Sequence, residues 1–184
     1  MSIDNIKLAY GVAYSSGANG YLGSVLITDY KGFPLEFRYT DPIVPTKIQQ
    51  VLYGEGLEKY IKLDVILDSL MRVLSNRFSV LLVQDEDLLQ YNSENITIIR
   101  ISSTKAPPLA NVGELSKVKN SEFLLQISHA GNPVRLQFSS KFITEGEQFN
   151  SIIEMLTEAG NYIDINEPLV RVYKTLELIC HQEG

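Results

Sequence analysis

Three consecutive acidic residues are the strongest candidates for chemistry in this chain. Asp85, Glu86 and Asp87 follow the apolar run FSVLLV, residues 78–83, with only Gln84 between them. Carboxylates at the end of a buried strand often hold a metal ion in α/β enzymes, but Asp and Glu also suit an ordinary helix start, where they complement unpaired amides. No second group of ligands stands at a fixed spacing elsewhere. We therefore predict a structural role, with a metal-dependent enzyme acting on a phosphate ester as the alternative.

A glycine-rich segment, SSGANGYLGS, is the second candidate, because Gly17, Gly20 and Gly23 have a spacing that superficially resembles a phosphate-binding loop. True phosphate loops follow a strand and open a helix, so that backbone amides and the helix dipole face the anion. Here the loop leads into another β-rich run. We predict a hairpin connection, with nucleotide binding at Gly17–Gly23 as the alternative.

Histidine and cysteine chemistry is poorly supported. The two histidines are His129, in a hairpin loop, and His181, close to the end of the chain, and neither position favours an orienting carboxylate in a dry pocket. Cys180 stands alone, so no intrachain disulfide can form and no zinc site is indicated. We predict no catalytic residue and no cofactor.

The composition predicts one globular domain over residues 1–184. Sixteen basic and 22 acidic residues give a net charge of −6, and the basic residues are scattered along the chain. Phosphate-backbone binding depends on clustered Lys and Arg, so the sequence predicts no direct binding of nucleic acid. No run approaches the length of a membrane span and no signal peptide is recognisable, which favours a cytoplasmic protein.

The periodicity predicts an α+β domain with about seven strands in a mixed sheet and about four helices, the last two forming a C-terminal helical pair. PLEFRYT alternates apolar and polar residues, as a half-buried strand does. FSVLLV reads as a fully buried strand parallel to an earlier one, and residues 56–75 as a helix laid on the sheet. Further strands are predicted at 96–102 and in a hairpin flanking HAGNP, a surface loop at 102–121, and a helix capped by Thr144.

The segment GFPLEFRYTDPIVPTKIQQVLYG, residues 32–54, predicts a strand, a proline-braced corner and a short helix. Thr46 and Gln49 have the spacing of a capping box, and Gly54 should end the helix. Arginine and aromatic side chains on rigid turns suit a protein-binding surface, and the alternative is that they simply brace the corner. The candidate partner-binding residues are Arg38, Tyr39, Lys47, Gln50 and Tyr53.

The same segment resembles a motif shared by small uncharacterised bacterial proteins, whose genes are associated with operons that also encode large nucleic-acid-remodelling enzymes. The resemblance covers about an eighth of the chain. It implies an accessory subunit and carries no catalytic residues. The sequence as a whole therefore predicts a non-catalytic accessory or adaptor subunit of a bacterial assembly that binds other proteins. A small metal-dependent enzyme or nucleotide-binding protein is the alternative.

Overall fold

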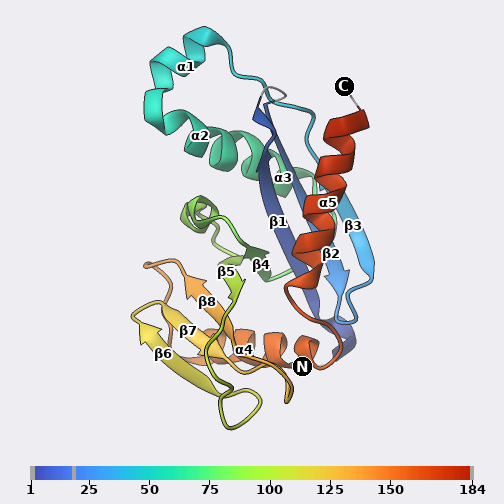
Figure 1. The fold of residues 1–184 in the computed structure, drawn as a ribbon, viewed down its shortest axis with the longest axis vertical. Coiled ribbons are helices and arrows are strands. Elements are labelled where there is room, and N and C mark those ends of the chain that lie inside the picture. The colour runs from blue at the N-terminus through green and yellow to red at the C-terminus, as the bar shows by residue number, and fades with distance from the viewer. Residues whose placement is uncertain (1–2, 18–19, 183–184) are drawn as a thin grey trace.

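The computed structural model describes residues 3–17 and 20–182 and is built on one eight-stranded sheet (Figure 1). The strands run in the order β3-β2-β1-β4-β5-β8-β7-β6. Their bounds are β1 Lys7–Ser15, β2 Tyr21–Asp29, β3 Pro34–Tyr39, β4 Val80–Val83, β5 Thr97–Ser103, β6 Leu115–Lys119, β7 Glu122–Leu125 and β8 Val134–Phe138. The predicted mixed α+β architecture is confirmed.

Strand direction divides the sheet into three parts. β1, β2 and β3 form an antiparallel meander, β4 and β5 run parallel to β1, and β8, β7 and β6 continue antiparallel from β5. The predicted parallel placement of the apolar run is confirmed, since Val80 to Val83 are all buried between β1 and β5. The prediction of a surface loop at 102–121 was incomplete, because this segment contains the strand β6.

Helices cover the two faces of the sheet differently. α4 (Glu147–Gly160) and α5 (Glu167–Gln182) pack on one face and bury the larger core, with residues such as Leu156 and Leu169 against Ile99 and Leu136. Each lies over its own part of the sheet, α5 against β1 and β2 and α4 under the β5–β8–β7 side (Figure 1).

The other face is covered by a helical segment made of α2 (Leu57–Tyr60), the π-helix η4 (Ile61–Leu67) and α3 (Asp68–Val73). The predicted helix on the sheet is confirmed, and Glu58, Asp64 and Arg72 on its predicted polar face are exposed. Lys62 is the exception: the helical periodicity predicts it on this polar face, but it is buried. A π-helix widens the turn, so side chains after its start leave the 3.6-residue phase on which the sequence prediction relied.

The proline-braced corner ends in α1 (Lys47–Tyr53), whose capping box is confirmed. The Gln49 amide donates to Thr46 Oγ1 at 3.2 Å, and the Thr46 amide donates to Gln49 Oε1 at 2.8 Å. Gly54, at φ 51°, ends the helix. α1 itself buries no residue and projects from the body of the molecule (Figure 1).

Two smaller predictions fail. α4 begins after Gly146 without a side-chain cap, and the Thr144 hydroxyl donates to Asn120 O at 3.5 Å instead. The alternation of PLEFRYT predicts that Leu35 faces inward, but it is exposed, and β3 lies at the edge of the sheet. Among the residues that the structure describes, no helix is long and apolar enough to cross a membrane.

Candidate functional site

The sheet has a topological switch point between β1 and β4. From β1 the chain proceeds outward through β2 and β3, and from β4 it proceeds in the opposite direction through β5. In open sheets, ligands bind outside the carboxyl ends of parallel strands at such a point. Asp85, Glu86 and Asp87 follow β4 after a single residue, Gln84, so the predicted acidic cluster does lie at this edge.

A buried lysine lies among these acids. The Lys62 ammonium is 2.6 Å from Glu58 Oε1, 2.8 Å from Asp85 Oδ2 and 3.1 Å from Asp87 Oδ2. Burial alone would lower the pKa of Lys62, but its hydrogen bonds to Asp85, Glu58 and Asp87 outweigh that effect and the pKa lies above its usual value. The lysine is therefore a fixed cation, and three carboxylates surround it.

Asp85 and Asp87 also serve the local backbone. Asp85 is the N-cap of the 3₁₀ helix η5 (Glu86–Gln90), and its Oδ1 accepts the Asp87 amide at 2.9 Å. This is the helix start that the sequence predicted. The neighbouring strand adds no acid, since β1 reads KLAYGVAYS and places Ala13 against the same core. In the described part of the chain, no three His, Cys, Asp or Glu side chains are placed to hold a metal ion.

The glycine segment connects β1 to β2. These strands are antiparallel from Lys7 with Asp29 to Ser15 with Tyr21, and Gly23 lies within β2. Positions 18 and 19 lie outside the described residues, so the nucleotide alternative at Gly17–Gly23 is judged from the strands alone. A loop that opens a strand presents no helix N-terminus to a phosphate.

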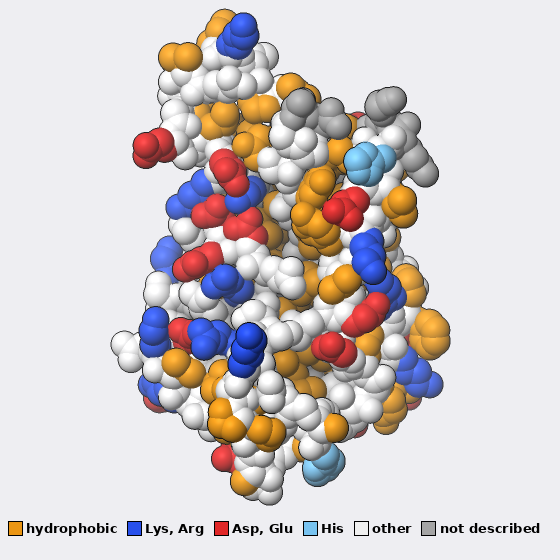
Figure 2. All heavy atoms as spheres, in the orientation of Figure 1, with side chains coloured by type: hydrophobic (Ala, Val, Ile, Leu, Met, Phe, Trp, Pro, Cys, Tyr) orange, Lys and Arg blue, Asp and Glu red, His pale blue; other side chains and the backbone are white. Residues whose placement is uncertain are grey.

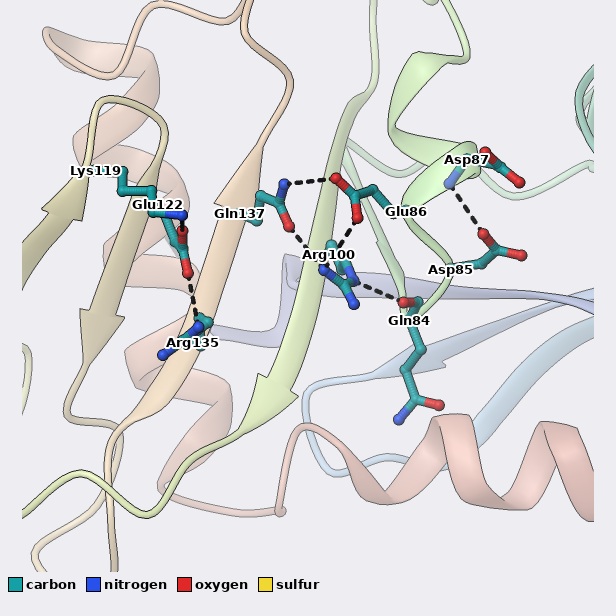
Figure 3. A network of polar contacts seen from close by, with 9 residues as sticks. All are labelled: Gln84, Asp85, Glu86, Asp87, Arg100, Lys119, Glu122, Arg135 and Gln137. Carbon is teal, nitrogen blue, oxygen red and sulfur yellow. Dashed lines mark hydrogen bonds and ion pairs between the residues drawn. The ribbon is translucent and has the colours of Figure 1, made fainter. Parts of the chain in front are cut away.

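On the other side of β4, Arg100 joins three elements (Figure 3). Its Nε donates to Gln84 O at 2.8 Å, and its Nη1 donates to Gln137 Oε1 at 3.0 Å. Nη1 also lies 3.7 Å from Glu86 Oε2. The Arg100 guanidinium, which belongs to β5, therefore contacts the chain at the carboxyl end of β4 and a side chain of β8. Part of its surface is open to solvent.

A second set of charges continues along this face. On β8, Arg135 Nη1 lies 3.0 Å from Glu122 Oε1, and Lys119 Nζ lies 3.9 Å from Glu122 Oε2. Arg100, Arg135 and Lys119 side chains are 38%, 48% and 78% exposed, so each can be reached by a ligand. The space-filling view shows Lys and Arg gathered where β6, β7 and β8 lie, with acids between them (Figure 2).

This part of the sheet is open because the core beneath the helical segment stops at Ile98 of β5. Beyond it, α4 covers β8 and β7 on one side, and no described helix covers the other (Figure 1). We call this surface, formed by Arg100, Lys119, Glu122, Arg135 and Gln137, the open sheet face.

The open sheet face was missed in the sequence, although a signal was present. ITIIRIS and PVRLQFSS both alternate, and Arg100, Arg135 and Gln137 occupy the polar positions of those strands. Pairing of β5 with β8 sets Arg100 opposite Gln137. The sequence shows each alternation but not which strands are neighbours.

A cavity of about 740 Å³ opens beside this face. Gln137 belongs to both, and Glu86, which lies 3.7 Å from Arg100 Nη1, also lines the cavity. The remaining lining comes from η5 and the chain after it, the start of β5, the segment after β8, and single residues before β7 and in α4. Its polar lining includes Asn92, Ser139 and Gln148. The cavity therefore extends the open sheet face inward with hydrogen-bonding side chains.

The predicted partner-binding residues lie elsewhere, on β3 and α1. Tyr39 and Tyr53 are exposed, and Tyr53 stacks on Tyr60 with ring centroids 4.6 Å apart, which braces α1 against α2. Arg38 Nε is 3.0 Å from Glu36 Oε1 and so is already paired. Binding of a partner through Arg38, Tyr39, Lys47, Gln50 and Tyr53 stays a prediction.

His129 lies in the β7–β8 loop, His181 lies in the last turn of α5, and Cys180 is buried beside Leu22 and Leu176. Cys180 and His181 are neighbours in α5, whereas His129 lies in a separate loop, between β7 and β8. Histidine-based catalysis finds no support in this arrangement.

Comparison with known proteins finds solved structures with a similar fold. No family model and no curated protein matches the chain. An endonuclease V from Streptomyces avermitilis is similar in structure, with a TM-score of 0.55 and 9% identity over 98% of this chain and 82% of that one. Endonuclease V from Ciona intestinalis, in complex with a 24mer DNA containing an inosine followed by a ribo-adenosine, has a TM-score of 0.52 and 8% identity over 97% and 87%.

These likenesses correct two predictions. The chain has a fold found in nucleic-acid-cleaving enzymes, which contradicts the prediction of a non-catalytic adaptor subunit that acts by binding other proteins. The prediction that nucleic acid is not bound directly is contradicted as well, since a solved structure with this fold contains DNA. Net charge was the misleading observation, because it averages over faces that carry different side chains.

Proposed function

We propose that this domain binds a strand of nucleic acid across the open sheet face, next to the carboxyl edge of the parallel strands. The observation that carries the proposal is the likeness to endonuclease V, which extends over nearly the whole chain. At such low identity the likeness concerns the fold, so the binding surface is argued from this chain's own side chains.

Three cations support the choice of surface. Arg100 and Arg135 come from neighbouring strands and Lys119 from the next hairpin, and all three are accessible. Guanidinium groups bind phosphate oxygens in two-pronged fashion, and the bonds to Gln137 and Glu122 hold these groups in place beforehand. The adjacent acids offset part of the attraction, so the affinity should be modest and strongly dependent on salt.

Phosphodiester cleavage through a metal at the acidic cluster finds no support in this geometry. Glu58, Asp85 and Asp87 would be suitable oxygen ligands, but all three already surround the Lys62 ammonium. A divalent cation at that place would lie against a fixed positive charge. The residues as arranged do not fit a metal ion.

The binding proposal is tested by charge reversal. Fluorescence anisotropy with labelled single-stranded and duplex oligonucleotides at low salt should show binding by the unaltered protein. The double variant Arg100→Glu, Arg135→Glu should weaken oligonucleotide binding by at least about tenfold. The variant makes fewer phosphate contacts, so fewer counterions are released from the nucleic acid when it binds. The slope of the logarithm of the association constant against the logarithm of the salt concentration is negative, and its magnitude should be smaller by about two in the variant.

A matched control uses the double variant Lys47→Glu, Lys174→Glu, which makes the same change in net charge on exposed residues of α1 and α5. It should bind almost as well as the unaltered protein. Equal losses in the two double variants would show that only net charge matters, and the open sheet face would then be rejected as the binding surface.

A further inference from the structure

The short helix α1 carries an apolar face that no described part of the chain covers. Ile48, Val51 and Leu52 follow the spacing i, i+3, i+4 and are 72%, 82% and 76% exposed. At this spacing they lie within an arc of about 100° on one side of the helix. Tyr53 comes from nearly the opposite side and stacks on Tyr60 of α2. The apolar face therefore points away from the body of the molecule, from which α1 projects (Figure 1).

The stability of α1 does not come from this face. Isolated helices shorter than about 12 residues are marginal in water, and protein helices gain most of their stability by packing an amphipathic face. α1 has seven residues and buries none of them, and it is held by the capping box of Thr46 and Gln49 and by the stacked tyrosines. Its apolar face is thus formed in advance, so little conformational entropy is lost when another surface covers it.

The charges at the two ends of this face suit a second copy of the same helix. Lys47 begins α1 and Glu55 follows its end, and each is four residues from Val51. Both are exposed, and within the described residues neither has an ion-pair partner. If two such helices lie antiparallel across a twofold axis at Val51, each Lys47 is opposite the Glu55 of the other copy. The two helix dipoles then also oppose each other, which is favourable.

The area of the face agrees with a weak dimer. A largely exposed aliphatic side chain offers about 100 Å² of apolar surface, so the three residues offer about 300 Å² per copy and about 600 Å² in a pair. Apolar atoms make up about 65% of homodimer interfaces, which gives a total contact of about 900 Å². This is close to the lower limit of about 1,000 Å² for specific interfaces, so the dissociation constant should be micromolar or weaker.

We propose that α1 pairs antiparallel with α1 of a second copy of this chain in a weak symmetric dimer. Ile48, Val51 and Leu52 form its apolar centre, and two pairs between Lys47 and Glu55 form its rim. α1 and the strands β6, β7 and β8 lie at opposite ends of the molecule (Figure 1), so the pairing leaves the open sheet face uncovered. The dimer does not depend on the proposed binding of nucleic acid.

Sedimentation velocity tests the dimer, with protein concentrations from the micromolar range to about 500 µM. The unaltered protein should change from monomer to dimer over this range. Leu52→Glu should weaken self-association by at least about tenfold, because it places a charge in the apolar centre. Its melting temperature in dilute solution should be unchanged, since Leu52 is exposed in the single chain.

The matched control is Leu178→Glu, which makes the same substitution on α5 at a side chain that is 62% exposed. It should dimerise like the unaltered protein.

A charge exchange tests the antiparallel arrangement. Lys47→Glu and Glu55→Lys should each weaken self-association by at least about threefold, because each places like charges opposite one another at both ends of the contact. The double variant Lys47→Glu, Glu55→Lys restores both ion pairs with their signs reversed and should dimerise nearly as well as the unaltered protein.

The dimer is rejected if the unaltered protein stays monomeric up to about 500 µM. It is also rejected if Leu52→Glu self-associates as strongly as the unaltered protein, since the contact would then lie elsewhere. A double variant that associates no better than the two single variants would overturn the antiparallel pairing.

Discussion

The environment of Glu36 differs from the one that the alternation of polar and apolar residues in β3 predicts. Its position in the alternation of β3 predicted a solvent-facing residue, but the carboxylate accepts the amides of Ser75 at 3.0 Å and Asn76 at 2.8 Å, and the Asn76 side chain at 3.1 Å. These bonds, led by the Asn76 amide, lower the pKa of Glu36 to about 2. Glu36 therefore joins β3 to the chain that follows α3.

The contacts of Glu36 predict how the stability of the protein depends on pH. Because the folded pKa of Glu36 is depressed, its contribution to stability is complete above the ordinary value of 4.5 and is lost as the pH falls towards about 2. Glu36→Gln should cost about 2 kcal/mol at neutral pH, and the difference from the unaltered protein should shrink over that acidic range. Urea titrations at several pH values measure both quantities.

If the difference in unfolding free energy between Glu36→Gln and the unaltered protein were the same at pH 7 and at the acid end, the anchoring role of Glu36 would be contradicted.

The contacts of Glu36 also bear on how the predicted partner-binding residues should be tested. Reversing the charge of Arg38 would place a second carboxylate beside Glu36, so Arg38→Glu should lower stability and is a poor probe of partner binding.

Lys62 carries a second prediction at this scale. Lys62→Met keeps most of the buried stem but leaves Glu58, Asp85 and Asp87 without their shared cation, so it should cost about 2 kcal/mol. Lys59→Met, on an exposed position of the same helical segment, is the matched control and should cost little. Equal unfolding free energies for the two variants would show that the cluster is not structural.

At the scale of elements, predictions succeeded where the signal is local. The capping box of Thr46 and Gln49, the buried run of β4 and the β7–β8 hairpin are each specified by residues close in sequence. The π-helix around Lys62 and strand β6 were not predicted, because both depend on what the segment packs against. Propensity alone does not reveal such tertiary effects.

α1 allows a test of local stability. Thr46→Ala removes the side-chain acceptor for the Gln49 amide and should cost about 1 kcal/mol, but α1 buries no residue. The loss should therefore appear as opening of α1 alone. Hydrogen exchange of amides in residues 47–53 should become about fivefold faster while the melting temperature stays nearly constant. A large fall in melting temperature would show that α1 is integral to the core.

At the scale of the whole molecule, the class of fold was predictable and the proposed binding face was not. Alternating runs and amphipathic helices indicated an α+β sheet protein, and that is confirmed. The open sheet face depends on the order β4-β5-β8-β7-β6, which brings Arg100, Arg135 and Lys119 onto one surface from segments spread over residues 100–135. A net charge of −6 does not reveal such a local arrangement.

Photo-crosslinking is the most direct measurement of the central claim that nucleic acid lies on the open sheet face. Oligonucleotides with photoreactive bases, bound at low salt and irradiated, should form adducts that mass spectrometry locates in β5, β8 and the β6–β7 hairpin. Higher salt should abolish the adducts, because the contacts are to phosphate. Adducts confined to β3, α1 or α5, or none at saturating oligonucleotide, would contradict the account.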